Sequence, residues 1–144
     1  MRHIVIFNLP DLGSVPFSQS LGPVVRGALT FLSGQYNAQL ALALDGVSTA
    51  YDVNIVEVDA FAIINLLIAS PAEFGLENVT QPARDCVGCD LDTYLFFDFV
   101  HPTTYGHGLI AEFAAEAMVD HYSPRKGKGY GPGTVNSLKG LAKP

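Results

Sequence analysis

Two short β-branched runs on either side of a long helical pattern constrain the fold of this chain more than any other feature. The runs "HIVIFNL" (3–9) and "VNIVEV" (53–58) each predict a strand, and Pro10 ends the first. Between them, apolar residues recur at helical spacing and predict a helix over 25–44, with apolar positions at 25, 29, 32, 36, 40 and 43. Strand, helix, strand is the order typical of an α/β fold with a parallel sheet covered by helices.

The second half of the chain predicts two more helices and a further extended segment. Asp59 is expected to cap an apolar helix that ends near residue 69, and "YLFF" (94–97) is expected to be extended. Thr103 or Thr104 is expected to cap the last helix, whose inner face is formed by Leu109, Ile110, Phe113, Ala117 and Met118. Two full strands make a small sheet, so the chain is expected to form part of a larger fold.

Charge divides the chain into an acidic body and a basic tail. All 14 Asp and Glu precede residue 121, and the formal net charge of the whole chain is −6. We therefore predict a partial α/β domain over residues 1–122 and a flexible, basic, Gly- and Pro-rich tail over 123–144. Contact with an anionic surface and a non-native terminus are alternative interpretations of the tail. The acidic body argues against binding to nucleic acid.

The two cysteines and the apolar runs give information on the cellular compartment of the protein. Cys86 and Cys89 in "DCVGC" lack the second pair of ligands that a structural zinc site needs, so a loop disulfide is expected, which suits an exported protein. No run of about 18 apolar residues is present to form a transmembrane helix, and the apolar run before Asn8 is too short for a signal peptide.

The pair Asp98 and His101 in "FFDFVHPT" is the strongest candidate for chemistry. A carboxylate three residues before a histidine can fold back onto its Nδ1–H, which fixes the tautomer and leaves Nε2 free as a base. A helix that starts just after His101 would favour the neutral ring. A turn cap by Asp98 with packing of His101 at the helix start is the structural alternative, because this spacing is common by chance.

The wider context of that pair resembles a known family. "DTYLFFDFVHPTTYGHGLIAEFA" (92–114) is similar to the block that ends the catalytic domain of GDSL, or SGNH, esterases and lipases. In this resemblance Asp98 and His101 align with the catalytic Asp and His of that block. "IVIFNLPDLGSVP" (4–16), "FLSGQYNAQLALAL" (31–44) and the segment 58–89 also resemble family segments in consistent order, so the resemblance covers roughly residues 4–119.

The resemblance implies a three-layer, flavodoxin-like parallel-sheet fold and ester hydrolysis without a cofactor or a metal. The family's nucleophile is the Ser of a Gly-Asp-Ser block, and this block does not occur in the sequence, nor do the blocks that supply the oxyanion Gly and Asn. The chain therefore resembles the C-terminal portion of such an enzyme. The nucleophile is expected from an unseen partner segment, from a second copy or, as a weaker candidate, from Ser14 in the loop after the first strand.

Two functions from different classes follow from this comparison. The first is a carboxylic ester hydrolase acting on a small or polymeric ester, with Phe17, Leu21 and Phe99 expected to line an acyl site. The second is a non-catalytic half-domain that folds as a homo-oligomer through its exposed first strand. The family suggests a secreted protein, although the sequence shows no signal peptide. His101 and His107 with Asp98 form only a weak candidate metal site.

Overall fold

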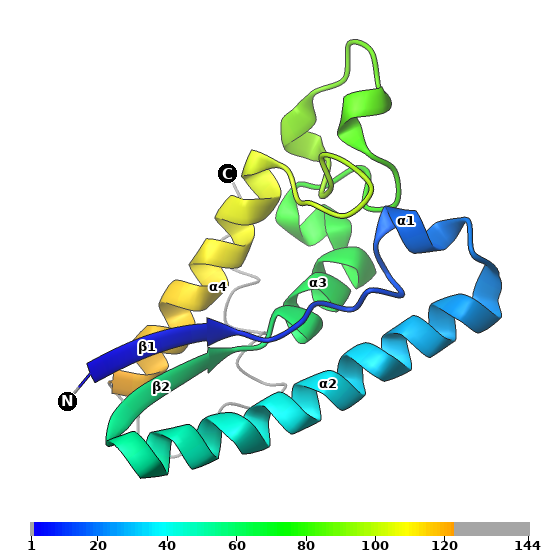
Figure 1. Ribbon diagram of the computed structural model, residues 1–144. Coiled ribbons are helices and arrows are strands. Elements are labelled where there is room, and N and C mark those ends of the chain that lie inside the picture. The colour runs from blue at the N-terminus through cyan, green and yellow to red at the C-terminus, as the bar shows by residue number, and fades with distance from the viewer. Residues whose placement is uncertain (1, 123–144) are drawn as a thin grey trace.

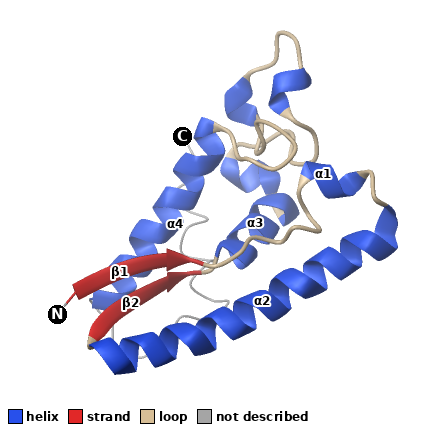
Figure 2. Ribbon diagram, viewed as in Figure 1, coloured by secondary structure: helices blue, strands red, loops and turns tan. Residues whose placement is uncertain are grey.

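The computed structural model describes residues 2–122, and the predicted tail 123–144 lies outside them. The chain runs through β1 (Arg2–Phe7), α1 (Pro16–Gln19), α2 (Gly22–Tyr51), β2 (Val53–Val58), α3 (Ala60–Ala69) and α4 (Thr104–Tyr122), with three 3₁₀ turns between α3 and α4. Figure 1 shows α2 running the length of the strand pair, and Figure 2 shows the loops gathered beyond the carboxyl ends of both strands.

The sheet consists of β1 and β2, which pair in parallel from Arg2 opposite Val53 to Phe7 opposite Val58. The α/β class is therefore confirmed. β2 has the predicted bounds, and β1 begins one residue before and ends two residues before the predicted run. Within residues 2–122 the sheet contains only these two strands, so the described part of the chain does not form the complete three-layer fold that the resemblance implies.

The first long helix, α2, is longer than its apolar pattern predicted. It begins at Gly22, which is followed by a proline, and it ends at Tyr51. The next residue, Asp52, adopts the left-handed conformation with φ 47°. Its buried residues are the polar Ser33 and Asn37, whereas many of its apolar side chains are exposed, including Val24, Phe31, Leu32, Tyr36 and Leu42. The apolar residues at helical spacing predicted the helix, but they did not predict which of its faces packs against the rest of the protein.

The hydrophobic core lies between β2, α3, α4 and the loop that precedes α4. Its buried members include Val56, Val58, Ile63, Ile64, Leu67, Leu95, Phe96, Leu109 and Phe113. The predicted start of α3 is confirmed, because the Asp59 carboxylate accepts a hydrogen bond from Ala62 N at 3.0 Å. No helix within residues 2–122 has the length and apolar character needed to span a bilayer.

The segment 71–103 is irregular, and the expected extended segment at 94–97 forms only isolated bridges. Tyr94 pairs with Asn78, and Phe96 pairs with Pro102. Cys86 and Cys89 are joined in a disulfide, as expected, and Cys89 Sγ lies 3.3 Å from the Tyr94 hydroxyl. The expected extended segment is thus present only as these isolated bridge residues and adds no strand to the sheet. Its apolar character comes instead from the burial of Leu95 and Phe96 beneath the loops.

Candidate active site

Asp98 and His101 form a compact turn immediately before α4. Asp98 Oδ1 accepts hydrogen bonds from Val100 N at 2.9 Å and from His101 N at 2.7 Å. The His101 Nδ1 atom lies 3.0 Å from Oδ1 and 2.9 Å from Oδ2. A carboxylate only accepts hydrogen bonds, so Nδ1 carries the proton in this geometry and Nε2 keeps its lone pair in the neutral ring.

The same contacts determine the charge of the carboxylate. The backbone N–H groups of His101 and Val100, and then the His101 ring, hold the pKa of Asp98 well below its usual value of 3.8. Asp98 is therefore ionised at neutral pH. The His101 side chain is 74% exposed, so its ring is accessible from solvent.

Hydrogen bonds on both sides hold this turn on the start of α4. Phe97 N donates to the His101 carbonyl at 2.8 Å, which closes the turn. The Thr103 hydroxyl donates to the Tyr94 carbonyl at 2.7 Å and lies 3.0 Å from Gly106 N, so it links the loop to the first turn of the helix. Of the two predicted caps, Thr103 therefore has this role.

Gly106 permits the helix to lie this close to the loop. A Cβ atom at this position would lie 2.6 Å from the Leu95 carbonyl oxygen and 3.1 Å from Pro102 Cβ. Any larger residue would therefore push the first turn of α4 away from the loop that carries His101. The position of the Asp98–His101 turn depends on this close approach.

Ser14 lies in the loop after β1, as predicted, and its hydroxyl contacts other polar groups. Ser14 Oγ is 2.9 Å from Asp11 Oδ2 and 3.1 Å from Asn65 Oδ1. The hydrogen bonds recorded for residues 2–122 include none between Ser14 and His101. The loop nevertheless meets the Asp98–His101 turn, because Phe17 N donates to the Phe99 carbonyl at 2.8 Å. The role of Ser14 as a nucleophile stays a prediction.

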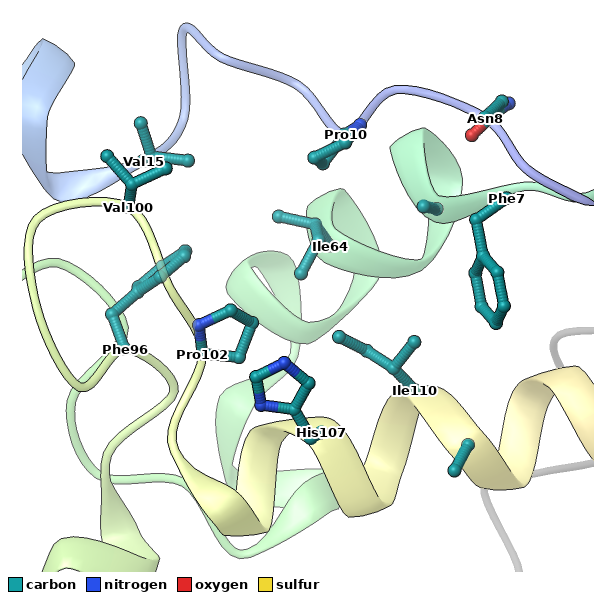
Figure 3. Close-up of a pocket in the computed structure, with 12 residues that line it drawn as sticks. Phe7, Asn8, Pro10, Val15, Ile64, Phe96, Val100, Pro102, His107 and Ile110 are labelled. Carbon is teal, nitrogen blue, oxygen red and sulfur yellow. The ribbon is translucent and has the colours of Figure 1, made fainter.

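An apolar cavity of about 550 Å³ opens beside the turn (Figure 3). Its wall comes from β1 and the loop after it, from α3, from the loop before α4 and from α4 itself. The lining residues are Phe7, Asn8, Pro10, Val15, Ala60, Ile64, Phe96, Val100, Pro102, His107, Ile110 and Ala111. Val100 and Pro102 are the chain neighbours of His101, so the cavity and the candidate base share one short segment.

The residues expected to line an acyl site are not part of this cavity. Phe17, Leu21 and Phe99 are exposed, and the Arg84 guanidinium lies 5.0 Å from the centre of the Phe99 ring. Sequence reasoning missed Phe7, Ile64 and Ile110, because their apolar character equally fits a core position and the cavity brings together distant segments. Proximity in sequence to His101 was the available signal for Val100 and Pro102.

The remaining histidines have separate contacts. His3 Nδ1 is 2.8 Å from the Tyr122 hydroxyl, and His121 Nε2 is 2.6 Å from Asn54 Oδ1. His107 Nδ1 is 3.0 Å from the Thr103 carbonyl. Across residues 2–122, no group of three or more His, Cys, Asp or Glu side chains is placed to hold a metal ion.

Comparison with characterised families and proteins agrees with the resemblance. Residues 1–114 match the model of the family described as GDSL-like lipase/acylhydrolase. An uncharacterised protein of the trpE–trpG intergenic region of Pseudomonas putida is 32% identical over 130 residues, which covers 78% of this chain and 21% of that protein. Esterase EstA of Pseudomonas aeruginosa is 31% identical over 128 residues, covering 78% and 19% of the two chains.

A plant relative extends the comparison. The anther-specific proline-rich protein APG of Arabidopsis thaliana is 29% identical over 120 residues, which covers 71% of this chain and 22% of that protein. The aligned part of this chain thus corresponds to about a fifth of the length of these relatives. Because the family model covers most of the residues, the chain belongs to the GDSL-like lipase/acylhydrolase family.

Proposed function

We propose that the chain contributes the acid–base pair of a carboxylic ester hydrolase of the SGNH type. The observation that carries this proposal is the contact of the Asp98 carboxylate with His101 Nδ1 at 2.9–3.0 Å, which orients Nε2 toward solvent as a base. Membership of the GDSL-like family and the similarity to a protein named as an esterase support the same reaction class.

In the proposed reaction His101 acts first as a base and then as an acid. Its Nε2 takes the proton of a serine hydroxyl while the serine oxygen bonds to the ester carbonyl carbon. The resulting oxyanion collapses, the bond to the alcohol oxygen breaks, and His101 returns the proton to that oxygen. Water then repeats the sequence on the acyl-serine and releases the carboxylic acid. Asp98 fixes the ring and stabilises the imidazolium throughout.

The nucleophilic serine is proposed to come from a partner segment or a second copy, with Ser14 as the weaker candidate. The hydroxyl of Ser14 contacts Asp11 and Asn65, and neither side chain is a base at neutral pH comparable to an oriented imidazole. A hydrolase also needs donors aimed at the developing oxyanion.

Ester hydrolysis by the purified chain tests the proposal for a nucleophile from a second copy or from Ser14. In that case we expect p-nitrophenyl butyrate to be hydrolysed by the wild type and by His3→Ala, which removes an exposed histidine far from the turn in sequence. His101→Ala should not hydrolyse it. A fluorophosphonate probe should label one serine, and mass spectrometry of the labelled peptide should identify it. Equal rates in the wild type and His101→Ala, or no labelling, would contradict the proposal.

A non-catalytic half-domain that assembles as a homo-oligomer is the second candidate. It is supported by the exposure of β1, where Val5 is 38% and Phe7 is 46% exposed although both belong to an apolar strand. A strand with an unpaired edge and exposed apolar side chains is prone to pair with another chain. Under this proposal the chain forms stable oligomers, and the fluorophosphonate probe labels no serine.

A further inference from the structure

The cavity beside the catalytic turn has an almost entirely apolar wall. Ten of its twelve lining residues are apolar, and the two exceptions are Asn8 and His107. The Asn8 side chain is already engaged, because its Nδ2 donates to Asp59 Oδ1 at 2.9 Å and its Oδ1 accepts from Phe61 N at 3.1 Å. His107 is therefore the side chain that defines the polar chemistry of this cavity.

The hydrogen bond of His107 fixes which ring atom is available. Its Nδ1 lies 3.0 Å from the Thr103 carbonyl oxygen, which can only accept, so Nδ1 carries the proton. In the neutral ring, Nε2 is then a bare acceptor. Figure 3 shows the ring extending from α4 into the cavity between Pro102 and Ile110. The cavity thus combines an apolar wall with one hydrogen-bond acceptor.

We propose that this cavity binds an aliphatic chain that ends in a hydroxyl donor, with the hydroxyl bonded to His107 Nε2. The volume of about 550 Å³ falls within the range of small-molecule sites. Apolar contacts with Phe7, Ile64 and Ile110 bind the chain, and the hydroxyl satisfies the acceptor that an alkane would leave unpaired. No lining residue carries a permanent charge, so an ionic head group gains no salt bridge here.

Such a ligand has the chemistry of the aliphatic alcohol that ester hydrolysis releases. Val100 and Pro102 line the cavity on both sides of His101 in sequence, which places a bound chain next to the candidate base. This link to catalysis rests on the proposed function. The binding itself does not, because it can be measured without turnover.

Two isomeric ligands isolate the contribution of the hydroxyl. 1-Octanol and heptyl methyl ether have the same atoms and similar apolar surface, but only the alcohol donates a hydrogen bond. Isothermal titration calorimetry of the full chain should show that octanol binds roughly two- to tenfold more tightly than the ether. His107→Phe should bind both compounds equally, whereas His107→Gln, which keeps an acceptor, should restore part of the preference.

A matched pair of tryptophan variants tests the place of binding. Ala111 lines the cavity on α4, and Ala43 is exposed on α2 away from it. Ala111→Trp should weaken both ligands at least tenfold, whereas Ala43→Trp should bind them as the wild type does. The proposal is overturned if the wild type binds both isomers equally or neither of them, if His107→Phe keeps the preference, or if the two tryptophan variants behave alike.

These outcomes also separate this inference from the proposed hydrolysis. Loss of hydrolysis in His101→Ala with unchanged octanol binding would support both conclusions. Octanol preference without any hydrolysis would leave the binding site standing and contradict the catalytic proposal. Hydrolysis without a preference for octanol would support the catalytic proposal and contradict the proposed binding site. A second copy that covers the cavity would abolish binding of both isomers and so overturn the inference.

Discussion

The Asp98 side chain combines two functions that are usually given to separate residues. One carboxylate oxygen accepts both backbone N–H groups of the turn, and the pair of oxygens faces the His101 ring. The carboxylate that orients the His101 ring therefore also holds the backbone of the turn. Changing Asp98 to alanine would remove both functions at once and would not distinguish them.

Asp98→Asn separates the two functions. The amide oxygen can still accept from Val100 N and His101 N, so the turn should persist, but the amide nitrogen cannot accept from Nδ1–H. We expect the Nδ1-protonated tautomer of His101 to be lost, with hydrolysis reduced roughly 10⁴-fold. The ¹⁵N shifts of the ring report the tautomer even without turnover. Asp92→Asn, at an exposed carboxylate, is the control and should leave the shifts unchanged.

The pKa of Glu57 on β2 leads to a prediction about how the stability of the fold depends on pH. Burial, and then the negative charges of Asp59 and Asp45, raise the pKa of Glu57 above its usual value of 4.5. Since the folded state favours the protonated form, the stability that this group contributes is complete below the unfolded pKa and is lost as the pH rises through the folded pKa. The ionised Glu57 carboxylate should therefore destabilise the folded state at neutral pH.

Replacement by the neutral isostere should reveal this cost. Glu57→Gln is expected to raise the free energy of unfolding at pH 7 by up to about 1 kcal/mol, because partial exposure screens the charges. The gain should shrink at pH 3, where the wild-type residue is protonated. Urea denaturation at the two pH values is the measurement, with the exposed Glu77→Gln as control. A gain that is equal at both pH values would contradict the electrostatic origin.

At the scale of elements, α2 is attached through polar side chains on one face. Thr30 Oγ1 donates to the buried Asp11 carboxylate at 2.7 Å, and Leu12 N donates to Ser33 Oγ at 3.3 Å. Asn37 accepts from Leu9 N at 2.8 Å and donates to the Leu9 carbonyl at 2.7 Å. The helix thus satisfies backbone groups of the loop that leaves β1.

Asn37→Asp tests this attachment. The carboxylate can accept from Leu9 N but cannot donate to the Leu9 carbonyl, which is left facing a negative charge. We expect the free energy of unfolding to fall by about 1–3 kcal/mol. Gln39→Glu makes the same chemical change at an exposed position of α2 and should have little effect. Similar losses in both variants would indicate a general effect of charge on the helix.

The elements that the sequence predicted well are those whose signal is local. β2 and α3 follow from a β-branched run and from an apolar run with an Asp cap, and the Asp98–His101 pair lies within four residues. The packing face of α2 was not predictable, because Ser33 and Asn37 bind loop atoms more than twenty positions away in the chain. The cavity was not predictable for the same reason.

At the scale of the whole molecule, the chain carries apolar surface that it does not bury itself. The exposed side chains of β1 are joined by those of α2, which include Val24 at 84% and Phe31 at 64% exposure. Extended apolar surface of this kind marks a site of interaction with another protein or another copy. The aligned part of the chain covers only 21% and 19% of two family relatives, so those proteins contain several times more chain.

We expect the isolated chain to associate through β1. Sedimentation velocity should show a concentration-dependent shift from monomer to oligomer, and Val5→Lys should displace the equilibrium toward monomer by at least tenfold, since lysine at a strand edge opposes pairing. Val87→Lys makes the same change at a fully exposed loop position and should not alter the equilibrium. A wild type that stays monomeric at high concentration would contradict this prediction.

The turn of Asp98 and His101 has a consequence for how such enzymes can be rearranged. Its internal hydrogen bonds span at most four residues. Thr103 joins it to Tyr94 and Leu95 nearby, and Phe17 N, from the loop after β1, donates to the Phe99 carbonyl. The contacts that align the His101 ring with Asp98 therefore lie within one short segment of the chain. An exchange of this segment between relatives should preserve the alignment while the surrounding scaffold changes.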